Sequence, residues 1–264
     1  MKAVLEKLQP VIIELADKEL MPRFNRVDHR VKDDGSLLTE ADTAMQQKVM
    51  DFVQTEWPQY ALLGEEMSVE QQQSLLDKNR QGLWILDPLD GTRNFASGVP
   101  IFSVSIALLV HDEVVLALIY DPVRKECFSA IKGQGAWLNN KQIKTDQVAE
   151  QLAQCIAQVD LKRLPEKLAV YLAKTHPYAS QRNFGSGALD WCWLAAGRVQ
   201  LYIHGGQKLW DYAAGQLILS EAGGCAVTLK NEVVFIRSLQ PRSIVAAAHS
   251  HLLNEWVKVI AASD

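Results

Sequence analysis

The chain has 264 residues, of which 48% are hydrophobic and 22% charged, which is the ordinary balance of a globular protein. This balance excludes a disordered, collagen-like or coiled-coil chain, and the formal net charge of −4 argues against a nucleic-acid-binding surface. A chain of this length can fold without disulfides. We expect one unit over residues 1–264, with an α+β first half, about 1–145, and an α/β second half, about 146–264.

The sequence shows no sign of export or of membrane insertion. The amino-terminal segment carries acidic residues within its apolar pattern, which a signal peptide does not tolerate, and no apolar run is long enough to span a membrane. The four cysteines form no CxxC pair and predict reduced thiols. We therefore expect a cytoplasmic protein that binds neither a membrane nor a nucleic acid.

The first half of the sequence predicts two helices followed by a series of strands. Apolar residues at helical spacing predict a helix over residues 5–24 with a kink at Pro10. Thr39 is typical of a helix N-cap and predicts a second helix over 40–57. Strands are predicted over residues 60–63, 83–86, 102–110, 114–121, 126–131 and 136–138, the third and fourth of which form a hairpin.

The second half alternates predicted strands with predicted helices. The strands are expected over residues 154–159, 200–203 and 244–248. The helices are expected over residues 165–174, 189–196, 211–222 and 250–261, with glycines after the second and third.

Acidic residues gather where predicted strands end or a predicted helix begins, at Glu65 with Glu66, at Asp87 with Asp90, and at Asp211. Strand ends are where layered α/β proteins usually present ligand sites. Asp87 and Asp90 can converge across a turn, and a hard cation such as Mg²⁺ would neutralise their repulsion. Taken one by one, these acids are more simply explained as solvated turn residues or helix caps, an N-cap in the case of Asp211.

Five segments of the chain carry recognisable motifs. Residues 84–95 read WILDPLDGTRNF, and residues 209–215 read LWDYAAG and continue to EAGG at 221–224. The other three are Thr-x-x-Asp at residues 39–42, Glu65 after Gly64, and the helix start GSGA at 185–188. In their order along the chain they resemble the motifs of the inositol monophosphatase family of Mg²⁺-dependent phosphomonoesterases, with residues 84–95 and 209–224 as its two signatures and Glu65 as its metal glutamate. The family usually has alanine where this chain has Gly187, a change that the helix start should tolerate.

The resemblance implies an α+β fold, a layered αβαβα sandwich, and a site that holds two or three Mg²⁺ ions, with Mn²⁺ as a possible substitute. One ion would be held by Glu65, Asp87 and the carbonyl of Leu89, and a second by Asp87, Asp90 and Asp211. Two such ions can clamp an in-line displacement at phosphorus.

The resemblance also implies roles for individual residues. Glu65 and Thr92 would orient the attacking water, Asp42 would accept a hydrogen bond from Thr92, and a water near Asp90 would protonate the leaving oxygen. Lys32 would lie in a loop that closes over the site, or else remain a solvated surface lysine. Substrate contacts are implied for Asp90, Gly91, Thr92, Gly185, Ser186, Gly187, His204 and Asp211, with backbone N–H groups of Gly91 and Thr92 cradling phosphate oxygens.

The match is weaker where the substrate would be selected. His204 stands where inositol-selective members carry a glutamate that binds a hydroxyl, so it either binds a hydroxyl or faces solvent, and Lys208 adds a cation nearby. We expect a phosphatase that acts on inositol monophosphate. Histidinol phosphate, fructose 1,6-bisphosphate and a nucleotide 3′,5′-bisphosphate remain open, as does a regulatory binding protein that retains the fold. The resemblance further implies a homodimer and sensitivity to lithium.

Overall fold

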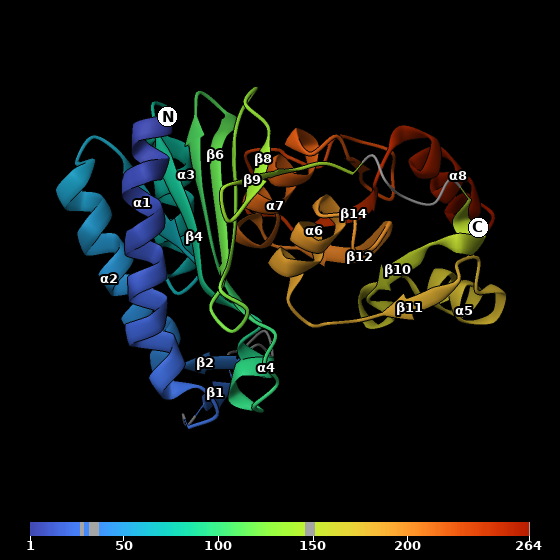
Figure 1. Cartoon of the computed structure of the whole chain (residues 1–264), viewed down its shortest axis with the longest axis horizontal. Helices are drawn as coiled ribbons and strands as arrows, with labels where there is room; N and C mark the ends of the chain where they lie inside the picture. Colours follow the sequence, from blue (N-terminus) through green and yellow to red (C-terminus); the bar gives the residue numbers. More distant parts are fainter. Residues whose placement is uncertain (27–28, 32–36, 146–150, 264) are drawn as a thin grey trace.

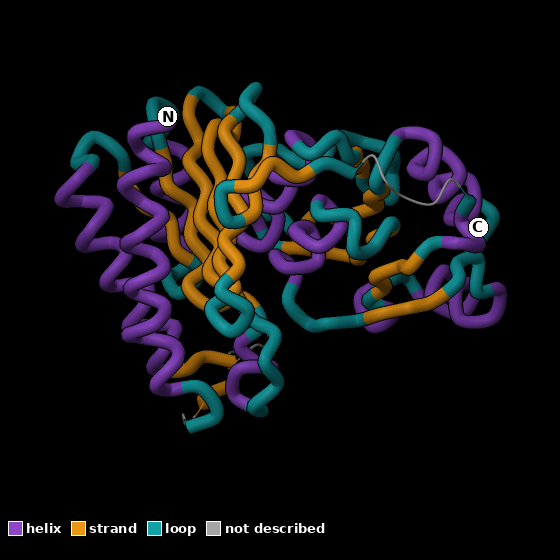
Figure 2. Tube along the Cα trace, in the orientation of Figure 1, coloured by secondary structure: helices purple, strands orange, loops and turns teal. Residues whose placement is uncertain are grey.

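Two β-sheets alternate with three layers of helices in the computed structural model, which describes residues 1–26, 29–31, 37–145 and 151–263 (Figure 1). The tube in Figure 2 shows the same succession of helical and extended layers. The predicted α+β sandwich of the αβαβα type is therefore confirmed. The division at residue 145 stays a prediction, and residues 146–150 lie outside the described part of the chain.

Helices α1 (Lys2–Leu15) and α2 (Glu40–Glu56) form the first outer layer. α1 continues through Pro10 and changes to a π-helix over Ala16–Leu20, so its pitch changes after Leu15. α2 begins with the predicted cap: the Thr39 hydroxyl accepts the N–H of Ala41 at 3.2 Å, and the N–H of Thr39 donates to Asp42 at 2.7 Å.

A seven-stranded sheet packs beneath these helices, in the order β3-β4-β5-β6-β7-β8-β9. β3 and β4 are parallel and the other pairs are antiparallel. The predicted hairpin between β5 and β6 is confirmed, with His111 and Asp112 both at positive φ in its turn. The strand bounds are Ala61–Gly64, Leu83–Asp90, Ser103–Val110, Glu113–Asp121, Glu126–Ile131, Ala136–Leu138 and Lys141–Ile143.

Strand β4 is buried on both faces and separates two hydrophobic cores. Trp84 and Leu86 belong to the core beneath α1 and α2, whereas Leu83 and Ile85 belong to the core on the opposite face. This alternation follows from the two-residue repeat of a strand, and it assigns Asp87 to the second face. Smaller elements surround the sheet: β1 (His29–Val31), β2 (Leu37–Thr39), α3 (Val69–Lys78) and α4 (Thr92–Ala96).

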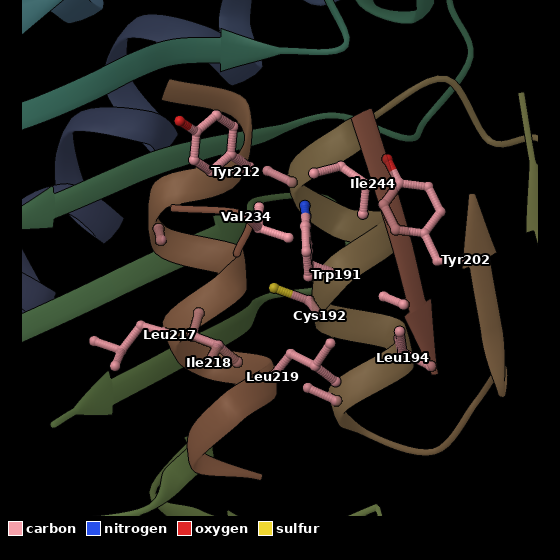
Figure 3. Packing of buried hydrophobic residues seen from close by; sticks show 14 of the residues in the cluster. Trp191, Cys192, Leu194, Tyr202, Tyr212, Leu217, Ile218, Leu219, Val234 and Ile244 are labelled. Carbon is pink, nitrogen blue, oxygen red and sulfur yellow. The ribbon is translucent and has the colours of Figure 1, made fainter. Parts of the chain in front are cut away.

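The central layer consists of α6 (Gly187–Ala195) and α7 (Leu209–Glu221), which lie between the two sheets. α7 begins two residues before its predicted start. Figure 3 shows Trp191 of α6 directed at α7, among the apolar side chains of the second core. Both helices are mostly apolar, with the two sheets covering them on two sides.

A five-stranded sheet follows, in the order β11-β10-β12-β14-β13, with β10, β11 and β12 mutually parallel where they pair. Its strands are Ile156–Val159, Ser180–Arg182, Leu201–Gln207, Cys225–Val227 and Arg242–Ala247 for β10 to β14. α5 (Glu166–Thr175) and α8 (Ser250–Ala261) form the last layer. Among the described residues, no helix combines the length and the apolar character that a transmembrane segment requires.

Candidate active site

A bulge in β4 turns its two aspartates toward the same side of the sheet. Asp87 pairs with Ser105 and Asp90 with Ser103, so three steps along β4 match two steps along β5. Residues three apart in a regular strand face opposite sides, and the one extra residue of a bulge corrects this. Pro88 lies within the bulge, where its missing N–H costs no ladder hydrogen bond. Both carboxylates thus face the layer of α6 and α7.

Asp90 caps helix α6 from across the layer boundary. Its carboxylate accepts the Ser186 hydroxyl and the backbone N–H groups of Gly187 at 3.2 Å and Ala188 at 2.9 Å. These donors have no partner within the helix, and the positive end of the helix dipole favours an anion there. The structure therefore brings Ser186 and Gly187, two predicted substrate contacts, onto a predicted metal ligand.

The four acids that the sequence nominates as metal ligands lie within electrostatic reach of one another. Burial raises the pKa of Asp87 well above its usual range, and the charges of Glu65, Asp90 and Asp211 raise it further. Burial likewise raises the pKa of Asp211, with added repulsion from Asp90 and Glu65, while Lys208 opposes the shift. Such repulsion among buried and half-buried carboxylates is typical of an acidic cluster.

The predicted ligands are four carboxylates and one backbone carbonyl. Oxygen ligands with this negative charge suit a hard divalent cation. In the part of the chain that the structure describes, no three His, Cys, Asp or Glu side chains are already gathered into a metal-binding cluster. Asp87 and Asp211 instead accept backbone N–H groups, from Leu89 at 3.0 Å and from Lys208 at 2.9 Å. The assignment of these acids as ligands therefore stays a prediction that the electrostatics support.

Thr92 and Asp42 make the hydrogen bond that the resemblance implies. The Thr92 hydroxyl lies 3.2 Å from Asp42 Oδ1 and 2.9 Å from the carbonyl oxygen of Leu89. Asp42 is fully buried, and its other oxygen accepts both the N–H and the hydroxyl of Thr39, at 2.7 and 2.6 Å. The N-cap of α2 thus fixes the carboxylate that faces Thr92.

The remaining predicted residues, Glu65 and Gly91, are held in place by their backbone contacts. Glu65 follows β3, where its N–H donates to Leu86 and its carbonyl accepts the Gln72 amide. Gly91 adopts a left-handed conformation, φ 90°, immediately before α4 begins at Thr92. A Cβ at this position would also lie 2.9 Å from the Ile101 carbonyl oxygen, so the turn requires glycine.

His204 does not face solvent, so that one of its two predicted orientations is wrong. Its side chain is 13% exposed, Nδ1 accepts the N–H of Gly206 at 3.1 Å, and Nε2 lies 3.6 Å from Asp160 Oδ2. Its contact with a substrate stays a prediction. Lys32, the predicted loop lysine, lies outside the described residues.

Helix α6 begins at Gly187, so the helix start tolerates glycine at this position, as expected. The side chain of Gln207 explains why glycine is present. A Cβ on residue 187 would lie 2.3 Å from Gln207 Nε2. That amide is fixed at both ends, since it accepts from Trp191 at 2.9 Å and donates to the Tyr202 hydroxyl at 2.8 Å.

Several polar residues outside the predicted set of site residues lie around the site. Asn94 donates to the carbonyls of Ile101 and Phe184 at 2.8 and 2.7 Å and so ties the β4–α4 turn to the loop before α6, beside Gly185. Asp190 is buried next to Gln158, and Asp160 lies beside His204. Asn94 stands within the first signature, whereas no spacing or motif distinguishes Asp160 or Asp190.

The sequence matches the model of the inositol monophosphatase family over residues 1–263, nearly the whole chain. The chain belongs to the inositol monophosphatase family. It is 32% identical to inositol monophosphatase 1 of Solanum lycopersicum over 271 aligned residues, which cover 98% of this chain and 97% of that protein. It is 33% identical to Nus factor SuhB of Haemophilus influenzae over 242 residues, which cover 90% and 87% of the two chains.

Two solved structures share the fold of this chain over nearly its whole length. The Thermotoga maritima IMPase has a TM-score of 0.86 and 25% identity and covers 100% of this chain and 98% of its own. The Bartonella henselae suhB protein has a TM-score of 0.85 and 26% identity and covers 98% of both chains. As a member of the inositol monophosphatase family, the chain is a phosphomonoester hydrolase.

Proposed function

We propose that the chain hydrolyses inositol monophosphate in a reaction that depends on Mg²⁺. The observation that carries the proposal is the group of four acids beside the Thr92–Asp42 pair, in which Glu65 and Asp90 raise the pKa of both Asp87 and Asp211. The carbonyl of Leu89 completes the proposed ligand set. When bound, the magnesium ions supply Lewis acidity that activates water and stabilises charge on the phosphoryl group.

The chain's own residues orient the water and the ester. Asp42 is fixed by two hydrogen bonds from Thr39, and its second oxygen accepts the hydrogen bond that the Thr92 hydroxyl donates. The lone pairs of Thr92 Oγ can then accept a hydrogen bond from a water at that oxygen. A water that donates to this oxygen and to Glu65 would be aligned on phosphorus. Its oxygen forms the new P–O bond as its proton passes to Glu65 and on to solvent. The ester P–O bond breaks, and a water held near Asp90 gives a proton to the leaving oxygen and regains one from solvent.

Removal of divalent metal tests the proposal most directly. We expect EDTA to abolish phosphate release from inositol 1-phosphate and added Mg²⁺ to restore it, with calorimetry showing Mg²⁺ binding in the absence of substrate. The panel also contains histidinol phosphate, fructose 1,6-bisphosphate and 3′-phosphoadenosine 5′-phosphate. Release that persists in EDTA would contradict the metal assignment, and preference for another ester would contradict the substrate.

Thr92→Val removes the hydroxyl while it preserves the shape of the side chain. We expect kcat to fall about a hundredfold, since general acid–base positioning contributes at least this much. Thr92→Ser, which keeps the hydroxyl, should retain most of the activity. Thr55→Val, at an exposed hydroxyl that bonds only the carbonyl of Asp51 in the same helix, is the matched control. Equal activity of Thr92→Val and the wild type would remove Thr92 from the mechanism.

A nucleotide substrate has one specific observation in its favour. The structure of SaIMPase-II bound to 2′AMP has a TM-score of 0.80 and 25% identity and covers 97% of this chain and 93% of its own. Comparison of 2′-AMP with inositol 1-phosphate in the same assay decides between the two esters. A homodimer, inhibition by lithium and a cytoplasmic location belong to the same proposal.

A regulatory binding role is the second candidate, because several similar proteins carry the name Nus factor SuhB rather than that of a phosphatase. A role played through the surface would survive loss of the acidic cluster. Complementation of a deletion strain by the wild-type chain and by Asp90→Asn separates the candidates: equal rescue indicates binding, and rescue by the wild type alone indicates hydrolysis. The net charge of −4 argues against direct contact with nucleic acid.

A further inference from the structure

Asn94 bridges two loops that are far apart in the sequence and adjacent in the fold. Its side-chain amide donates one hydrogen bond to the Ile101 carbonyl at 2.8 Å and one to the Phe184 carbonyl at 2.7 Å. Ile101 lies in the loop between α4 and β5, and Phe184 lies 90 residues from Asn94 in the loop between β11 and α6. Both distances are at the short end of the ordinary range for N–H···O bonds, so the amide holds both loops closely.

The bond to Ile101 secures the turn that carries Gly91 and Thr92. A Cβ on residue 91 would lie 2.9 Å from the Ile101 carbonyl oxygen, so this carbonyl packs directly against the turn. Asn94 is the third residue of α4, which begins at Thr92, and its own carbonyl accepts the N–H of Val99 at 2.8 Å. The loop after α4 is therefore folded back onto the start of that helix.

The bond to Phe184 secures the loop that leads into α6. Gly185 follows at φ 75°, and the Ser186 hydroxyl then donates to the Asp90 carboxylate. A Cβ on Gly185 would lie 3.2 Å from the Asn94 amide nitrogen, so the loop and the amide are in direct contact. A shift of the Phe184 carbonyl would therefore move a donor that holds Asp90.

The two loops carry the two sides of the proposed reaction. Thr92, which orients the attacking water, bonds Asp42 at the start of α2, whereas Asp90, near which the leaving oxygen is protonated, is held by the start of α6. Asn94 stands beside Thr92 on α4 and reaches across to the α6 loop, so its amide sets the separation of these two sides. Misplacement of reacting groups by about 1 Å can cost about a hundredfold in rate.

The chemistry of this bridge requires an amide. The –NH₂ group of asparagine supplies two donors from one nitrogen, and because both partners are carbonyl oxygens, they also determine which way the amide points. An ionised aspartate has the same shape and no donor, so it would place a carboxylate oxygen against two carbonyl oxygens.

We propose that Asn94 is a positioning residue of the reaction, whose amide holds the start of α6 at a fixed distance from the start of α4 and thereby aligns the water at Thr92 with the ester oxygen near Asp90. Asn94 acts through the two loops and contacts neither the ester nor a metal ion. The proposal rests on the proposed function, because it requires a phosphomonoester held between Thr92 and Asp90.

Two substitutions of Asn94 test the alignment. On the ester that the wild type hydrolyses fastest with Mg²⁺, we expect Asn94→Ala to lower kcat about tenfold and Asn94→Asp to lower it further, while KM stays within about threefold. The Phe184 ring packs edge-on against buried Trp193 at 4.6 Å between centroids, so the loop keeps a second anchor and the variants should fold. Circular dichroism and thermal melting establish the folded fraction, to which each kcat is referred.

A double-mutant cycle tests the route through the α6 loop. Because Asn94 is proposed to act through the loop that carries Ser186, the kcat loss caused by Asn94→Ala should be smaller in a Ser186→Ala background than in the wild type. Losses that multiply in full would show that the two side chains act independently, and would overturn this route.

The matched control is Asn139→Ala, in the turn between β8 and β9. The Asn139 side chain also joins two segments, since it donates to the Lys125 carbonyl at 3.0 Å and accepts the N–H of Cys127 at 2.9 Å. This variant should lose at least as much stability, because residue 139 also has a positive φ, and it should keep its kcat.

The remaining outcomes separate the positioning role from the phosphatase itself. An unchanged kcat in folded Asn94→Ala, or a loss confined to KM, overturns the positioning role while the phosphatase stands. A fall in kcat of the same size in Asn139→Ala would show a general effect of weakened folding and overturns it as well. A wild-type enzyme that hydrolyses no ester of the panel with Mg²⁺ overturns the proposed function, and the role of Asn94 with it.

Discussion

Asp90→Asn is expected to lower kcat for Mg²⁺-dependent phosphate release by at least about a hundredfold, the usual cost of removing a preorganised electrostatic group from an active site. The substitution removes one of the four mutually repelling carboxylates. It also places an amide NH₂ opposite the donors of Ser186, Gly187 and Ala188, so that donor faces donor at the start of α6. Loss of this cap should destabilise the fold by about 1–3 kcal/mol.

A matched control separates these two effects. Asp121 is fully buried outside the proposed ligand set, and it accepts the backbone N–H groups of Val123 and Arg124 at 2.9 and 3.0 Å and the Arg124 guanidinium at 2.9 Å. Asp121→Asn should therefore lose similar stability in urea titrations and keep its kcat. Mg²⁺ binding measured by calorimetry should weaken only in Asp90→Asn. Unchanged turnover by folded Asp90→Asn would contradict the two-ion assignment.

The elements with strong local signals could be predicted from the sequence. Thr39 with Asp42 marks the start of α2, and apolar spacing predicts α8 with the bounds Ser250–Ala261 that the structure has. α7 starts before its prediction because Asp211 accepts the N–H of Lys208 from the third helical position. The sequence does not distinguish an aspartate at the first position of a helix from one at the third position. The predicted start of α7 therefore lies two residues after the observed one.

The acidic cluster could be predicted because its members stand in motifs, whereas the groups that hold it could not. Asp90 lies in the first signature, yet its role as the cap of α6 depends on a contact across 96 to 98 residues of chain. The bulge that aligns Asp87 with Asp90 is visible only in the pairing with β5. That Asp160 lies beside His204 follows only from the pairing of β10 with β12.

The sequence also does not show why residue 215 is glycine, because the reason is a contact with Trp191 of another helix. We expect replacement of Gly215 to destabilise the fold strongly. A Cβ on Gly215 would lie 2.4 and 2.5 Å from Cγ and Cβ of Trp191, which is fully buried between α6 and α7 (Figure 3). Cβ and Cγ stand at the root of the indole side chain and cannot swing away. Overpacking of this kind costs about 1–3 kcal/mol, and alanine returns about 1 kcal/mol of helix propensity. We expect Gly215→Ala to lose about 2 kcal/mol, because the contact is far inside the normal limit.

Gly215→Ala should also disturb the acidic cluster, because Asp211 lies one helical turn before Gly215 on α7. Displacement of Trp191 breaks its 2.9 Å hydrogen bond to Gln207, and movement of α7 at Gly215 shifts Asp211, one turn earlier, away from Asp90. Urea titration should therefore show a lower midpoint, and the folded fraction should bind Mg²⁺ more weakly. Gln216→Ala, at the next residue on α7, is the control, because it also introduces alanine but gains only a few tenths of a kcal/mol, on the order of 0.3 kcal/mol, in helix propensity. If Gly215→Ala is as stable as Gln216→Ala, α6 and α7 can separate without cost, and close packing of these helices does not position Asp211.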